Sequence, residues 1–139
     1  MDVLLRSAGS QIGSKALVDT GAPVCVFPRG VGDLLGLDFP EYPSDASDKV
    51  HLMGRVWPAI SANVELMLKP FVDDAWSADV LFVLDDGLPF GLLGYAGFLN
   101  RWAVGVNGYL GYFIVESVDD FDARQPAGVL DKLRRDHPS

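Results

Sequence analysis

Asp19, Thr20 and Gly21 stand between two apolar runs and are the residues best suited to chemistry. Ala16-Leu17-Val18 leads into the triplet and Val24-Cys25-Val26-Phe27 leaves it, and both runs are typical of buried strands. Gly21 allows a sharp turn of the backbone between them. The pattern therefore predicts a carboxylate at a loop between buried strands, where it could act as an acid or base.

The same triplet can also form a simple turn, in which the Asp side chain accepts a hydrogen bond from the backbone two residues on. A second element downstream favours the functional interpretation. Phe90-Gly91-Leu92-Leu93-Gly94 is an apolar, glycine-containing segment, and Tyr95-Ala96-Gly97-Phe98-Leu99 follows it.

Val18-Asp19-Thr20-Gly21-Ala22 resembles the active-site motif of the retropepsin-like aspartic proteases. Leu92-Leu93-Gly94 resembles the hydrophobic-hydrophobic-Gly motif that lies under the catalytic loop in that family. The order and separation of the two motifs fit, and the similarity covers residues 1–116. The chain resembles the small bacterial aspartyl-protease-like members more than the viral enzymes.

The resemblance implies that Asp19 is the catalytic residue and that Thr20 hydrogen-bonds to the same loop of a partner subunit. Gly21 and Ala22 would line the floor beneath the backbone of a peptide substrate. The residues that would pack beneath the loop and hold it are Leu92, Leu93 and Gly94. Viral members pair an acid with an Arg at positions where this chain has Pro23 and Tyr95, so their mode of dimer support does not carry over.

Aspartic-protease chemistry needs two carboxylates that share one proton across a water molecule. This chain contains one Asp-Thr-Gly, since Asp85 and Asp86 belong to an expected turn and Asp79 lacks a following Thr-Gly. A symmetric homodimer with one Asp19 from each subunit is the economical solution. Two alternatives stay open: a non-catalytic dimerisation or peptide-binding module with the same fold, and a plain structural β domain.

A flap that closes over the substrate is expected between the two motifs. The candidate is the stretch from residue 50 to residue 58, with Met53, Gly54 and Arg55 at its tip and as its substrate-binding residues. An ordinary hairpin is the alternative, because this stretch has a single glycine and a Trp57-Pro58 pair.

Composition narrows the class of partners. The 139 residues have a net charge of −8, which argues against nucleic-acid binding and against attraction to anionic lipid. No cofactor is expected, and His51 and His137 lack metal-ligand spacing. No apolar run is long enough to span a membrane and no secretory signal is visible, so the expected location is cytoplasmic. Cys25 is expected to be a buried structural thiol.

Seven or so short strands with one or two brief helices predict an all-β fold, a small closed barrel of acid-protease type. Residues 1–116 would form the protease domain and residues 117–139 a charged C-terminal tail. Within the domain, the residue pattern predicts a turn near Asp73-Asp74 and a short helix over Tyr95–Trp102.

Overall fold

The computed structural model of the chain describes residues 1–69, 71–125 and 135. The chain divides into two compact units, Met1–Phe98 and Leu99–Ser139. Both motifs singled out in the sequence lie in the first unit, so each unit is described by itself. The domain boundary expected after residue 116 stays a prediction.

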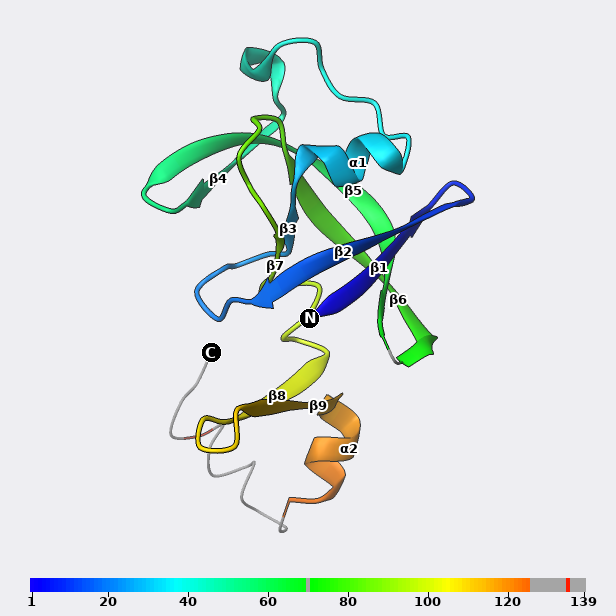
Figure 1. Cartoon of the computed structure of the whole chain (residues 1–139), viewed down its shortest axis with the longest axis vertical. Coiled ribbons are helices and arrows are strands. Elements are labelled where there is room, and N and C mark those ends of the chain that lie inside the picture. The colour runs from blue at the N-terminus through cyan, green and yellow to red at the C-terminus, as the bar shows by residue number, and fades with distance from the viewer. Residues whose placement is uncertain (70, 126–134, 136–139) are drawn as a thin grey trace. The chain divides into compact units, whose positions relative to one another are not determined.

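The first unit is a closed β-barrel (Figure 1). Its sheet has the strand order β1-β2-β7-β3-β6-β5-β4, and β1 also pairs with β5, so six strands form a ring and β4 extends it outside. This confirms the predicted all-β closed barrel. The strands are β1 (Asp2–Ser7), β2 (Ser10–Val18), β3 (Val26–Phe27), β4 (Asp48–Leu52), β5 (Arg55–Leu68), β6 (Phe71–Val83) and β7 (Gly91–Leu93).

Alternating side chains direct one face of each long strand into the barrel. Along β6, Trp76, Ala78, Val80 and Phe82 are buried, and exposed or half-buried residues stand between them. This is the period-2 pattern of a strand with one face in the core. The largest fully buried side chains of this unit include Leu5, Phe27, Leu35, Leu66, Phe82, Leu93 and Phe98.

The helices that the structure describes within residues 1–125 are short. α1 (Arg29–Leu34) follows β3, and a 3-10 turn covers Pro43–Asp45. α2 (Val118–Ala123) belongs to the second unit. Among the described residues, no helix has both the length and the apolar character needed to cross a membrane.

The second unit contains an antiparallel hairpin, β8 (Trp102–Asn107) and β9 (Tyr112–Ser117), followed by α2. Ser117 caps this helix, because its hydroxyl accepts a hydrogen bond of 3.1 Å from the backbone amide of Asp120. An ion pair joins Arg124 to Glu116 next to the helix.

Two local predictions are wrong. Asp73 and Asp74 lie inside β6 and not in a turn, because that strand already begins at Phe71, which pairs with Leu68 of β5; the register then shifts before Trp76 pairs with Leu66. The stretch Tyr95–Trp102 forms turns and an isolated bridge in place of a helix. Its Ala96 pairs in parallel with Val24, and Gly97 has a φ of +96°, so backbone pairing and a left-handed residue replace the helix.

Candidate active site

The loop that joins β2 to β3 carries Asp19 and is held by three hydrogen bonds that its backbone amides donate. The amide of Asp19 donates to the carbonyl of Leu93 at 3.0 Å. The amide of Gly21 donates to Oδ1 of the Asp19 side chain at 2.9 Å, and the amide of Ala22 donates to the Asp19 carbonyl at 3.2 Å. The carboxylate is therefore oriented by its own loop, and the loop is attached to the second motif.

The second motif lies beneath this loop because β7 pairs on both sides with the strands that frame Asp19. β7 runs parallel to β2, with Val18 opposite Leu93, and antiparallel to β3, with Val26 opposite Leu92. Leu93 is fully buried and Leu92 nearly so. The structure thus brings Leu92, Leu93 and Gly94 next to the loop of Asp19, whereas their role in supporting catalysis stays a prediction.

Three further bonds continue the attachment after Leu93. The amide of Tyr95 donates to the carbonyl of Ala22 at 2.9 Å, and the amide of Ala96 donates to the carbonyl of Pro23 at 2.9 Å. The amide of Cys25 in turn donates to the carbonyl of Ala96 at 3.3 Å. Residues 22–25 and 94–96 therefore run side by side, and the Asp19 loop has little freedom to move as a whole.

Gly94 makes this close approach possible. A β-carbon at this position would lie 2.7 Å from the carbonyl oxygen of Ala22 and closer still to the carbonyl group of Val24. Contacts this short are not found in proteins, so any side chain at residue 94 would push the two segments apart. The glycine of the second motif is thus required by backbone packing.

The triplet itself faces outward. Asp19 is half-buried, Thr20 and Gly21 are exposed, and the side chain of Ala22 is buried. Apart from the bond from Gly21, no hydrogen bond reaches the Asp19 carboxylate from the residues that the structure describes. The half-buried Asp19 is within reach of water and of a ligand, whereas Ala22 is buried and both of its backbone groups are hydrogen-bonded within the protein.

The β4–β5 hairpin contains the three residues predicted as a flap tip. Leu52 pairs with Arg55, so Met53 and Gly54 form a two-residue turn, and their φ angles are +50° and +74°. Such left-handed pairs give the turn that matches the twist of a hairpin. Met53, Gly54 and Arg55 are all exposed. The hairpin is confirmed, whereas its role as a flap stays a prediction.

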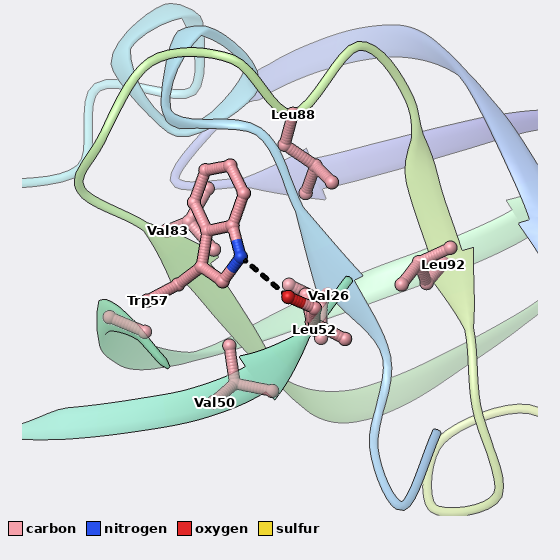
Figure 2. Packing of buried hydrophobic residues seen from close by; sticks show 8 residues of the cluster. Val26, Val50, Leu52, Trp57, Val83, Leu88 and Leu92 are labelled. Atoms are coloured by element: carbon pink, nitrogen blue, oxygen red, sulfur yellow. Dashed lines mark hydrogen bonds between the residues drawn. The ribbon is translucent and has the colours of Figure 1, made fainter. Parts of the chain in front are cut away.

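The hairpin and the Asp19 loop share one hydrophobic cluster, shown in Figure 2. Trp57 of β5 is buried in it, and its Nε1 donates to the carbonyl of Leu52 across the hairpin at 3.1 Å. Val26 of β3 and Leu92 of β7 come from the strands that frame Asp19. The other members are Val50, Leu52, Ala59, Val83 and Leu88.

Cys25 is no candidate nucleophile. Its side chain is fully buried, and burial raises the pKa of the thiol to about 11 although a hydrogen bond with the Gly94 backbone acts in the opposite direction. A thiol in this state is protonated and unreactive at neutral pH. Within the described residues, no group of three or more His, Cys, Asp or Glu side chains could hold a metal ion.

Several contributors to the site were not foreseen from the sequence. Ala96 pairs with the Asp19 loop from within a segment that was predicted to be helical. Gly91 begins β7 and lies against the ring of Phe27, where a β-carbon would come within 2.6 Å of two ring carbons. The glycines on both sides of Leu92-Leu93 were the available signal, since glycine within a strand marks close approach of other atoms.

Comparison with known proteins places the fold. No protein-family model matches the chain, and no curated protein sequence is similar to it. Among solved structures, the chain is similar to a retropepsin-like aspartic protease from Rickettsia conorii, with a TM-score of 0.58 and 15% sequence identity. The match covers 84% of this chain and 88% of that protein. The barrel that carries Asp19 therefore has the fold of a retropepsin-like aspartic protease.

Proposed function

We propose that the protein is a homodimeric aspartic endopeptidase, in which Asp19 of each subunit contributes one carboxylate to the catalytic pair. The observation that supports this most is the attachment of the Asp19 loop to β7 through the Leu93 carbonyl and Gly94. This arrangement holds an accessible carboxylate at a fixed place on a barrel of retropepsin-like fold. A loop that served only as a turn would not need a second strand beneath it.

The chemistry of the proposed pair follows from the proximity of two carboxylates. Two such groups a few ångströms apart share one proton, because both cannot ionise together at low cost. The ionised carboxylate removes a proton from the attacking water, and the protonated one donates to the carbonyl oxygen of the scissile peptide bond. The hydrogen bond from Gly21 to Oδ1 leaves the other Asp19 oxygen for the shared water.

The remaining residues of the site have supporting roles in this proposal. Thr20 is exposed beside Asp19, so its hydroxyl is available for the same loop of the second subunit. The exposed backbone of Gly21 offers polar groups to a peptide in extended conformation. The β4–β5 hairpin would close over that peptide and exclude water, with Met53, Gly54 and Arg55 nearest to it.

Digestion of a peptide library with and without pepstatin tests the proposal, with wild type compared to Asp19→Asn. The substitution keeps the size of the side chain and removes the acid, so cleavage should fall by more than about 1,000-fold while the fold persists. Asp86→Asn is the control for the same chemical change at an exposed acid of a loop outside the Asp-Thr-Gly motif. It should cleave like wild type, with the same sensitivity to pepstatin.

The outcomes separate the function classes. Cleavage by Asp19→Asn at the wild-type rate would contradict the proposal. A wild-type protein that binds peptides from the library and releases them uncut would instead favour the non-catalytic binding module.

A further inference from the structure

Arg55 makes two contacts at the tip of the β4–β5 hairpin. Its guanidinium carbon lies 3.4 Å from the centroid of the Trp57 ring, and its Nη2 lies 3.8 Å from Oδ2 of Asp85. The Arg55 side chain is 51% exposed and that of Asp85 37%, so the ion pair is open to salt. Arg55 thus connects the hairpin to the loop that follows β6.

Trp57 gives the guanidinium a fixed surface to stack on. Residues 55 and 57 lie on the same face of β5, because side chains alternate along a strand. The indole is buried against Val83 and Leu88, and its Nε1 bond to Leu52 fixes its orientation (Figure 2). A planar guanidinium stacks well on such a ring, whereas a lysine would supply only a point charge.

Asp85 belongs to a segment that runs into the candidate active site. The loop is anchored at Leu84, whose amide donates to the Pro58 carbonyl at 2.8 Å and whose carbonyl accepts from Nη1 of Arg29 at 3.1 Å. From there the chain passes through Leu88 of the cluster to β7, which holds the Asp19 loop. The ion pair therefore joins the hairpin tip to the segment that leads to β7.

We propose that Arg55 is a positioning residue for substrate, which keeps the β4–β5 hairpin closed by stacking on Trp57 and pairing with Asp85. This inference rests on the proposed function, since the hairpin matters for cleavage only if it covers a peptide at Asp19. Loss of the pair lets the hairpin open more often, so a substrate escapes more easily before it is cut. The effect falls on KM more than on kcat.

Hydrogen exchange on the full chain tests the closed position without any need for activity. Asp85→Asn should speed amide exchange over residues 53–56 about two- to five-fold, as expected for an exposed pair. Asp86→Asn should leave these amides unchanged, and Asp85→Glu, which keeps the charge, should restore wild-type exchange. Glu65→Gln breaks a comparable pair with Arg6, which lies 3.5 Å away on β1, and should not affect the hairpin tip.

Kinetics on a cleavable peptide tests the consequence. Asp85→Asn and Arg55→Gln should raise KM about two- to five-fold with kcat changed less, and the difference from wild type should shrink as salt screens the pair. Arg55→Lys should fall between Arg55→Gln and wild type, because it keeps the charge and loses the planar stack.

Three results would contradict either the role of Arg55 or the proposed function. Equal exchange at the hairpin tip in the Asn variants of residues 85 and 86 would overturn the inference, and so would faster exchange with an unchanged KM. An Asp19→Asn variant that cleaves at the wild-type rate would overturn the proposed function instead. The exchange measurement stays interpretable in that case, so the two failures are distinguishable.

Discussion

Gly94 lies with its α-carbon against the carbonyl group of Val24, and this contact sets the distance between the Asp19 loop and the segment after β7. The neighbouring bonds, from Tyr95 to Ala22 and from Ala96 to Pro23, form only while the two backbones stay this close. The geometry of the candidate site thus depends on the absence of one side chain.

The first prediction concerns this contact. Gly94→Ala should lower the free energy of unfolding by about 3 kcal/mol or more, because the added methyl group meets backbone atoms that cannot move aside. Gly30→Ala is the control. Gly30 lies in α1, and a β-carbon there would have nothing within 4 Å. It should leave stability unchanged or raise it by up to about 1 kcal/mol. Urea denaturation measures both, and equal losses would contradict the prediction.

The second prediction concerns the support beneath the loop. Leu93→Ala should cost about 3 kcal/mol, because Leu93 is fully buried and its removal leaves a cavity under Asp19. Leu17→Ala makes the same chemical change on the neighbouring strand, where the side chain is 52% exposed, and should cost less than about 1 kcal/mol. Thermal denaturation of both variants tests the difference. A larger loss for residue 17 would show that the loop is not held through Leu93.

The third prediction uses the buried thiol as a pH probe. Burial raises the pKa of Cys25 from 9.0 to about 11, so the unfolded chain loses this proton at a lower pH than the folded one. The contribution of the thiol to stability is therefore fully present below pH 9 and decreases between pH 9 and 11. The total decrease should be roughly 2–3 kcal/mol.

Cys25→Ala provides the reference for this measurement, because it removes the thiol and leaves all other ionisable side chains in place. The free energy by which wild type is more stable than the variant should decrease between pH 9 and 11. A gap that stays constant from pH 8 to 11 would mean that the thiol is more accessible to water than its burial indicates.

The fourth prediction concerns assembly. If each subunit supplies one Asp19, specific activity should fall on dilution below the dissociation constant of the dimer. Sedimentation velocity and peptide cleavage should be measured over the same dilution series, and the two curves should share a midpoint. A monomer with full activity per chain would contradict the paired mechanism.

The candidate site could be located from the sequence because both of its motifs combine a local signal with neighbouring apolar residues. Asp19-Thr20-Gly21 marks a loop between strands, and Leu92-Leu93-Gly94 marks a buried strand that ends in close packing. The Met53-Gly54 turn was recognisable in the same way, since residues 50–58 had hairpin character. These features depend on a few neighbouring residues.

The wrong predictions depend on partners that are distant in the sequence. Asp73 and Asp74 look like turn residues, yet β6 already begins at Phe71, opposite Leu68 of β5, and its register against β5 shifts between Phe71 and Trp76, where the two acids lie. Phe98, Leu99 and Trp102 have helical spacing, but the bridge between Ala96 and Val24 fixes the preceding backbone. A local residue pattern contains no information about such long-range pairing.

The Asn107-Gly108 pair shows a smaller effect of the same kind. Asn-Gly between two apolar runs is typical of a two-residue hairpin turn. In the structure Asn107 ends β8 and β9 begins at Tyr112. The Asn107 side chain accepts a bond from the amide of Leu110 at 2.9 Å, and Gly111 takes the left-handed conformation, with a φ of +70°. The asparagine thus stabilises a longer loop through its side chain.

The parallel pairing of Ala16 with Gly91 also affects the order in which the chain folds during synthesis. During synthesis the ribosome releases Asp19 long before β7, and the carbonyl that fixes the aspartate amide belongs to Leu93. Contacts between such distant segments form late in folding, because the intervening chain must first be closed into a loop. A nascent chain that ends before Gly91 thus lacks the strand that organises Asp19.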